Sequence, residues 1–391
     1  METGPDVDAA RSVSMIRAVG KIPPSFGPDR CAEMRKTRHN LWWIGALMGS
    51  AATAGACDLC GCYTPQIDAL LLAADPSAFG QAWPAVNQQG GWLSHTSFAV
   101  AEQSTYFGTL QFDGQEVTNP TGQYLASSIT QLVAGYSFTP RFALQMNLPL
   151  IYRSFQRPEG FAIDHGTESG LGDISLLGKF VFFHHETGGT SALKFDDPKN
   201  PHLEAREPDL TISALLLAGV KFPTGGTSQL KEEFHEVEVP GAPPSGIHGH
   251  DLTLGSGSYD AITGGQFSLR YKSFFFLADT QFALRSEGAH QYQFANDLSW
   301  SGGPGYYFVR NRGVVVGLQW VCAGEHKRLD RFQGQPAEDT GITAVFLGPR
   351  VVASFGKVSG ELAVEMPVSL DNTAFQAVPD YRLRGSLAIR F

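Results

Sequence analysis

Long apolar runs, charged residues and catalytic motifs are all scarce in this chain of 391 residues. Beyond the N-terminal region no apolar stretch reaches the roughly 18 residues that a membrane-spanning helix needs, which excludes a helical membrane protein. Only 17% of the residues are charged, and the net charge of −9 argues against a nucleic-acid partner. No G-x-S-x-G, H-E-x-x-H or phosphate-binding glycine loop occurs, so the sequence predicts neither an enzyme nor a cofactor.

Glycine and phenylalanine are abundant instead, with 44 and 27 residues. Few charges combined with dispersed apolar residues are typical of an outer-membrane β-barrel, in which the apolar residues alternate along each strand. From about residue 91 to the end, the sequence follows this period of two.

The last predicted strand, 380–391, shows the pattern clearly. Its odd-numbered positions are mostly apolar or aromatic, whereas three arginines occupy even-numbered positions. Because side chains alternate across a strand, one face suits lipid and the other is polar. A soluble, secreted β-rich protein would also alternate, but its strands usually have about 5 or 6 residues, and the segments here have roughly 10 to 15.

The sequence therefore predicts an all-β fold: a transmembrane antiparallel up-and-down β-barrel of about 12 strands over 91–391. The strands are expected at 91–112, 122–138, 140–154, 170–184, 208–223, 255–271, 273–287, 290–309, 312–326, 341–355, 357–369 and 380–391.

Short and long connections are expected to alternate, as periplasmic turns and extracellular loops do. The longer connections are expected at 113–121, 155–169, 224–254, 327–340 and 370–379. An even number of strands places both termini in the periplasm. The segment 185–207 does not fit, because it is long on the side where turns should be short.

An export signal is predicted in residues 34–56. A basic segment begins at Met34, an apolar run follows at 41–47, and the small residues 54–56 form an A-x-A cleavage site. A short buried helix is the alternative, which the basic flank and the small-residue exit disfavour. Residues 1–33 have no coherent pattern and are interpreted as an upstream extension, with Met34 as the true start.

The segment 57–90 would then lie in the periplasm. It begins with Cys57, Cys60 and Cys62 and continues into a short predicted helix at 65–74. Three interpretations of the cysteines remain open: a disulfide, a Cu or Zn site, and lipidation of Cys57.

Two motifs resemble the family of outer-membrane transporters of the phenol meta-degradation pathway. One is Gly170–Lys179 (GLGDISLLGK), and the other is Gly255–Ala261 (GSGSYDA), which follows Phe222–Gly225 (FPTG). The resemblance covers 91–391 and implies a small aromatic or otherwise hydrophobic solute. The terminal Phe391 resembles the signal read by the barrel-assembly machinery. The cysteine segment is not part of the family's pattern.

Charged residues on the polar face of the strands are the candidates for solute selectivity. They are Asp173, Lys179, Lys221, Asp260, Arg270, Asp279, Arg285, Glu361, Glu365, Arg382 and Arg384. The two glutamates are expected to face the last two arginines across neighbouring strands. A structural lattice of charges that fills the barrel is the alternative, since twelve strands lie between filled and open barrels.

The histidines and Cys322 give weaker indications of function. The His184-His185 pair lies at a strand end, and His248 and His250 form an H-x-H motif that can chelate a metal but lacks a third ligand at a defined spacing. Cys322 is expected to be a small apolar residue.

The predicted function is a passive outer-membrane channel whose partners are lipid, the barrel-assembly machinery and a small solute. In this prediction the segment 57–90 is a periplasmic plug or latch. The alternative is a structural, redox or metal-handling protein that the barrel anchors in the membrane.

Overall fold

A computed structural model describes residues 92–391, apart from 189–191, 195–201, 205–207, 236–238 and 312. The predicted export signal, the cysteines of the segment 57–90 and the predicted helix therefore lie outside the described residues. Within the described part of the chain, no helix is long and apolar enough to cross a membrane.

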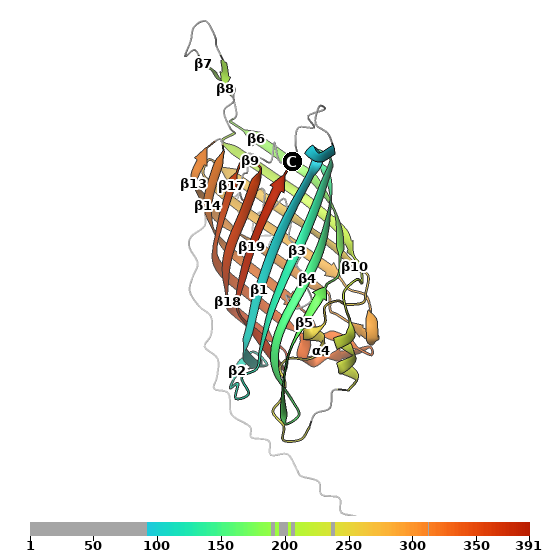
Figure 1. Ribbon diagram of the computed structural model, residues 1–391. Coiled ribbons are helices and arrows are strands. Elements are labelled where there is room, and N and C mark those ends of the chain that lie inside the picture. The colour runs from blue at the N-terminus through green and yellow to red at the C-terminus, as the bar shows by residue number, and fades with distance from the viewer. Residues whose placement is uncertain (1–91, 189–191, 195–201, 205–207, 236–238, 312) are drawn as a thin grey trace, which may run out of the picture. The chain divides into compact units, whose positions relative to one another are not determined.

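Twelve antiparallel strands form a closed barrel, as predicted (Figure 1). They are β1 (Thr96–Phe112), β3 (Tyr124–Thr139), β4 (Phe142–Glu159), β6 (Ser175–Thr187), β9 (Leu210–Lys221), β10 (Asp260–Tyr271), β11 (Phe274–Leu284), β13 (Asp297–Asn311), β14 (Val314–Lys327), β17 (Ile342–Phe355), β18 (Val358–Asn372) and β19 (Phe375–Arg390). The last strand closes on the first along its whole length, from Ser97 opposite Arg390 to Phe112 opposite Phe375.

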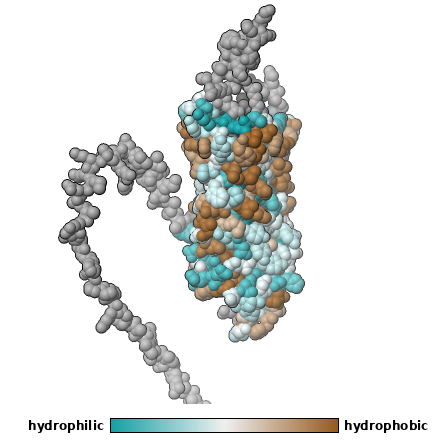
Figure 2. Space-filling view, turned by 90° about the vertical axis from the view of Figure 1, so that its left-hand side faces the viewer, coloured by the Kyte–Doolittle hydropathy of each residue, from teal (hydrophilic) through white to brown (hydrophobic). Residues whose placement is uncertain are grey.

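The period of two in the sequence becomes the inside and outside of the wall. In β14, Leu318 and Trp320 are 46% and 56% exposed on the outer face, whereas Gln319 and Val321 are fully buried inside. Apolar residues gather over the outer wall, and hydrophilic residues gather at its ends (Figure 2). Cys322 shares the outward, apolar parity of Leu318 and is half-buried.

One end of the barrel has tight turns and carries the C-terminus (Figure 1). Two residues or fewer separate β10 from β11 and β17 from β18 there. The connection between β6 and β9 is long, as predicted for 185–207, although it lies at the end with the tight turns. It contains a small hairpin of β7 (Ala192–Lys194) and β8 (His202–Glu204).

The opposite end carries long connections, and the structure corrects two of their predicted boundaries. The expected loop 155–169 is an extension of β4, which pairs with β5 (Ala162–Leu171) as a two-stranded ribbon. The expected loop 370–379 is a tight turn at 373–374, because β18 runs on to Asn372.

Four further predicted strand starts are wrong. The GLGD motif does not open β6, which begins at Ser175, because the Asp173 carboxylate binds backbone N–H groups of another loop at Gly225 and Ser256 instead. The strands β1, β10 and β13 begin at 96, 260 and 297 rather than at 91, 255 and 290.

The remaining long connections contain short elements. These are β2 (Gln115–Val117), η3 (Ser228–Phe234), α4 (Gly249–Leu252), η4 (Ala289–Gln291), β12 (Tyr292–Gln293), β15 (Asp330–Phe332), β16 (Gln335–Ala337) and η5 (Glu338–Thr340). A further short element, η2 (Trp92–His95), precedes β1.

Candidate functional site in the barrel lumen

A belt of ion-paired side chains crosses the middle of the lumen. Arg382 donates from Nη2 to Glu365 at 2.7 Å and lies 3.4 Å from Glu325, with its guanidinium 3.9 Å from the ring centroid of Phe346. Arg384 lies 3.5 Å from the other oxygen of Glu365. The predicted facing of Glu365 with these arginines is therefore observed.

Glu361 has a different partner from the one predicted. The register places it opposite Ser386 rather than opposite an arginine, and its carboxylate lies 3.6 Å from Arg350 of β17. Asp279 accepts a hydrogen bond of 2.6 Å from Ser301 across β11 and β13.

Two further candidates are held by polar residues of neighbouring strands. Lys179 is buried against Gln145 of β4, and Arg270 is buried and donates to Thr211 of β9 at 2.9 Å. Each of these cations is therefore bound into the inner surface of the wall.

A second chain of charges lies at the end with the long connections. Lys221 bridges Asp173 at 3.0 Å and Asp260 at 2.8 Å, and Arg285 continues the chain from Asp260 to Asp297. Burial alone would raise the pKa of Asp173, but Lys221 and the surrounding N–H groups hold it below its ordinary value. This network fixes the two ends of the loop 222–259, because Lys221 and Asp260 flank it.

That loop folds into the mouth of the barrel. Ile247 and Leu252 are buried in one apolar cluster with inward side chains of the wall, among them Phe107 and Phe155. Arg153 of β4 is fully buried and donates to the backbone carbonyls of Asp251, at 2.6 Å, and Thr253. The loop is thus anchored from inside the wall.

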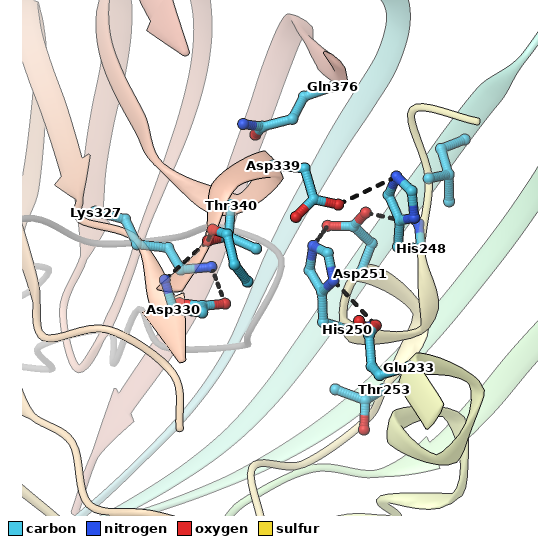
Figure 3. Close-up of polar contacts among 12 residues, drawn as sticks. Glu233, His248, His250, Asp251, Thr253, Lys327, Asp330, Asp339, Thr340 and Gln376 are labelled. Atoms are coloured by element: carbon cyan, nitrogen blue, oxygen red, sulfur yellow. Dashed lines mark hydrogen bonds and ion pairs between the residues drawn. The ribbon is translucent and has the colours of Figure 1, made fainter. Parts of the chain in front are cut away.

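Two histidines of the same loop are paired with carboxylates: His248 with one on a neighbouring connection, and His250 with two within the loop itself (Figure 3). His248 lies 3.3 Å from Asp339 of η5, while His250 lies 3.1 Å from Glu233 of η3 and 3.4 Å from Asp251. Burial alone would lower the pKa of His250, but the carboxylates of Asp251 and Glu233 raise it well above its ordinary value. Burial alone would likewise raise the pKa of Glu233, but His250 lowers it to about 2.

A buried tyrosine completes this junction. Tyr292 of β12 stacks on His250 with ring centroids 5.8 Å apart and donates to Asp330 at 2.7 Å. Burial and the Asp330 carboxylate raise the pKa of Tyr292 well above its ordinary value. Over the described residues, no group of three His, Cys, Asp or Glu side chains is arranged to hold a metal ion.

An apolar cluster lines the lumen near the tight turns. It contains Phe275 and Tyr307, whose rings stack with centroids 4.3 Å apart, together with Val315 and Val352. The lumen thus has a charged belt with an apolar cluster on either side along its axis.

Most predicted lumen residues lie inside as expected, but the prediction missed important partners. Glu325 and Arg350 occupy inward positions of β14 and β17 and complete the central belt. Their parity in the sequence was sufficient to find them. The parity of Arg153 in the sequence places it on the polar face of its strand, but its contact with a loop distant in sequence has no local signal.

Two further residues singled out in the sequence, His184 and Phe391, lie near the end of the barrel that has the tight turns. His184 points to Ser213 inside the barrel with a hydrogen bond of 2.6 Å. Phe391 lies edge-on to Phe98, with ring centroids 5.9 Å apart, and its role in assembly remains a prediction.

No protein-family model matches the sequence, and no characterised protein sequence is detectably similar to it. Among solved structures, the chain is similar to the COG4313 outer membrane channel from Pseudomonas putida F1, with a TM-score of 0.47 and 14% identity over 78% of this chain and 98% of that one. It is also similar to the beta domain of the Bordetella autotransporter BrkA (TM-score 0.40, 10% identity, 76% and 100% coverage) and to a Pseudomonas aeruginosa FadL homologue (0.29, 8%, 76% and 90%).

Proposed function

We propose that the protein is an outer-membrane channel for the passive diffusion of small solutes, with both termini on the periplasmic side. The observation that carries this proposal is a closed barrel with an apolar outer wall and ion-paired charges inside. A soluble barrel would place its apolar residues inside and its charges outside, so this distribution suits lipid around the wall and water or solute within it.

The proposed solutes are small molecules that combine an aromatic ring with a polar substituent. The stacked Phe275 and Tyr307 offer aromatic contacts near the tight turns, and Phe107 and Phe155 do so at the other end. Between them the charged belt around Arg382 suits a polar substituent. This supports the aromatic solute that the family resemblance implies.

The proposed gate is the loop 222–259, which fills the mouth opposite the termini through Ile247 and Leu252. The segment 57–90 is proposed as a second plug or latch on the periplasmic side. The two proposed closures can be tested separately. Truncation removes the segment 57–90, and a substitution in the wall releases the loop 222–259.

Single-channel conductance in planar bilayers tests the channel. We expect steady conductance from a chain starting at residue 91 and a smaller one from residues 57–391. Liposome swelling should then admit phenol or benzoate faster than an uncharged sugar of similar mass. Silence from both chains, with heat-modifiable gel mobility proving that the barrel is folded, would contradict the proposal and favour a thiol site anchored by the barrel. Replacement of Cys57, Cys60 and Cys62 by serine leaves the flux of a channel intact.

A further inference from the structure

A carboxylate lies on the outer face of the barrel, in the middle of the wall. In β1 the inward neighbours Ala101 and Gln103 are buried, whereas Phe98 and Val100 are exposed on the outer face with exposed fractions of 47% and 48%. Glu102 shares the outward parity of these two residues. Through the middle of the described wall, the other outward positions are apolar, aromatic, small or hydroxyl-bearing.

Three hydroxyl groups hold this carboxylate. Ser128 and Ser104 donate to Oε1 of Glu102 at 2.6 and 3.1 Å, and Thr130 donates to Oε2 at 2.5 Å. The serine and threonine of β3 are outward residues, because the intervening Ile129 is buried inside. The carboxylate is therefore fixed in one orientation, and Oε2 retains capacity for a further donor.

The site lies deep in the wall. Phe98 and Tyr106 stand equally far along β1 on either side of Glu102, roughly 10 Å away for a tilted strand. Phe98 meets Phe391 near the terminal end, and Tyr106 stacks between Tyr124 and Tyr381 with centroid distances of 6.1 and 5.8 Å. Aromatic rows of this kind mark the membrane interfaces, so the carboxylate lies near the midplane.

A notch opens beside the carboxylate. Gly385 of β19 lies directly opposite Glu102, between the exposed side chains of Leu383 and Leu387. A Cβ atom at Gly385 would make only ordinary van der Waals contacts, with Leu362 Cδ1 at 3.6 Å and the Glu361 carbonyl oxygen at 3.8 Å, so the notch over this glycine is bounded by Leu362 of β18. On the opposite side the hydroxyls of β3 occupy the equivalent position.

Over the described residues, no cationic side chain is bound to this carboxylate. A carboxylate facing hydrocarbon is costly, and the hydroxyls supply hydrogen bonds but no positive charge. The described outward positions at this depth hold no lysine or arginine, so a second copy of the barrel cannot supply one either. A membrane-soluble molecule with a cationic group meets the requirement.

We propose that Glu102, its three hydroxyl donors and the notch over Gly385 form a membrane-facing binding site for the ammonium group of a hydrophobic amine. The ammonium donates to Oε2 and cancels the charge, and the apolar chain of the amine lies over Leu383 and Leu387. Ser104, one of the three donors, lies on the side of the carboxylate that faces the tyrosine row at the interface. The site is separate from the lumen and goes beyond the proposed channel.

Binding of dodecylamine to the full-length barrel in neutral-detergent micelles tests the proposal, with dodecanol as the uncharged probe. Native mass spectrometry should show dodecylamine binding about 10- to 100-fold more tightly to the wild type than to Glu102→Gln, the range expected for one charge-assisted hydrogen bond. Dodecanol should not distinguish the two proteins, and single-channel conductance should be the same for both.

Two variants keep the test decisive. Gly385→Leu fills the notch without removing the charge and should weaken dodecylamine binding to a similar extent, including if Glu102→Gln fails to fold. Thr280→Val removes an outward hydroxyl on β11 and should leave binding unchanged. Equal binding by the wild type, Glu102→Gln and Gly385→Leu overturns the proposal. So does a wild-type dimer that dissociates in Glu102→Gln, because the patch would then join two copies of the chain.

Discussion

Glu365 inside the barrel and Glu102 outside it are both carboxylates removed from bulk water, and their surroundings differ in kind. Glu365 is fully buried among Arg382, Arg384 and the rest of the central belt, whereas the groups around Glu102 are neutral hydroxyls. Inside, each charge is cancelled within the chain, so the belt joins the strands across the lumen. Outside, the charge is held in place but left uncancelled, which leaves it available to a molecule in the membrane.

The largest expected effect is on the inner carboxylate. Replacement of Glu365 by glutamine leaves Arg382 and Arg384 without their shared counter-charge in a buried site, which should lower the free energy of unfolding by roughly 3 to 5 kcal/mol. Urea unfolding of the refolded barrel in lipid vesicles, followed by heat-modifiable gel mobility, measures this loss. A loss below about 1 kcal/mol would show that water in the lumen already solvates the belt, as in an open pore.

The next largest expected effect is on conductance, and it tests whether the wall holds the loop 222–259 in the mouth of the barrel. Replacement of Arg153 by leucine removes charged donors to the carbonyls of Asp251 and Thr253, each worth about 1.5 kcal/mol or more. The loop 222–259 should then leave the mouth more often, and single-channel conductance should rise several-fold. Tyr152→Leu, which changes the neighbouring outward residue of β4, should leave conductance as it is. Unchanged conductance in Arg153→Leu would place the restriction elsewhere in the lumen.

A third prediction concerns pH at the mouth. The raised pKa of His250 means that its stabilising contribution is present below about pH 6.5 and is lost as the pH rises through the folded-state pKa. The lowered pKa of Glu233 means that its contribution is present above about pH 4.5 and is lost as the pH falls toward 2. Conductance should therefore be lowest between these limits and rise on either side.

The histidine variants separate this junction from general effects of pH on the barrel. His250→Gln should abolish the alkaline rise in conductance, because the titrating group is gone. His235→Gln, at an exposed position just after η3, should retain it. A wild-type conductance that is flat from about pH 5 to pH 10 would contradict a role for the junction in closing the mouth.

The barrel itself was predictable from the sequence, because alternation is a local property of each strand. The parity of Gln145 and Arg153 in β4, or of Arg382 and Arg384 in β19, was enough to place their side chains inside. Strand ends were less predictable where a side chain leaves the ladder for a distant partner. Asp173 is the clearest example, since its partners at Gly225 and Ser256 come from another loop.

The sites were predictable only in part. Parity identifies which residues share the lumen, but pairing also depends on register, so Glu361 was assigned to the wrong arginine while Glu365 was assigned correctly. Parity also places Glu102 on the lipid face. Its hydroxyl partners on β3 depend on the register between two strands, which the sequence does not specify.

The smallest expected effect has the opposite sign to the largest. Replacement of Glu102 by glutamine removes a charge from the lipid-facing wall, where an acidic residue costs less than the roughly 2 to 4 kcal/mol of a basic one. The amide keeps one oxygen that accepts from a hydroxyl, and its NH₂ group can donate to the hydroxyl that loses its acceptor, so only part of the hydrogen bonding is lost. We expect the free energy of unfolding to rise by about 1 kcal/mol in the vesicle assay used for Glu365→Gln. The same carboxylate-to-amide change would then destabilise the inner site and stabilise the outer one. A destabilisation of about 2 kcal/mol or more at Glu102 would mean that this carboxylate holds β1 and β3 together, and the distinction between the two sites would fail.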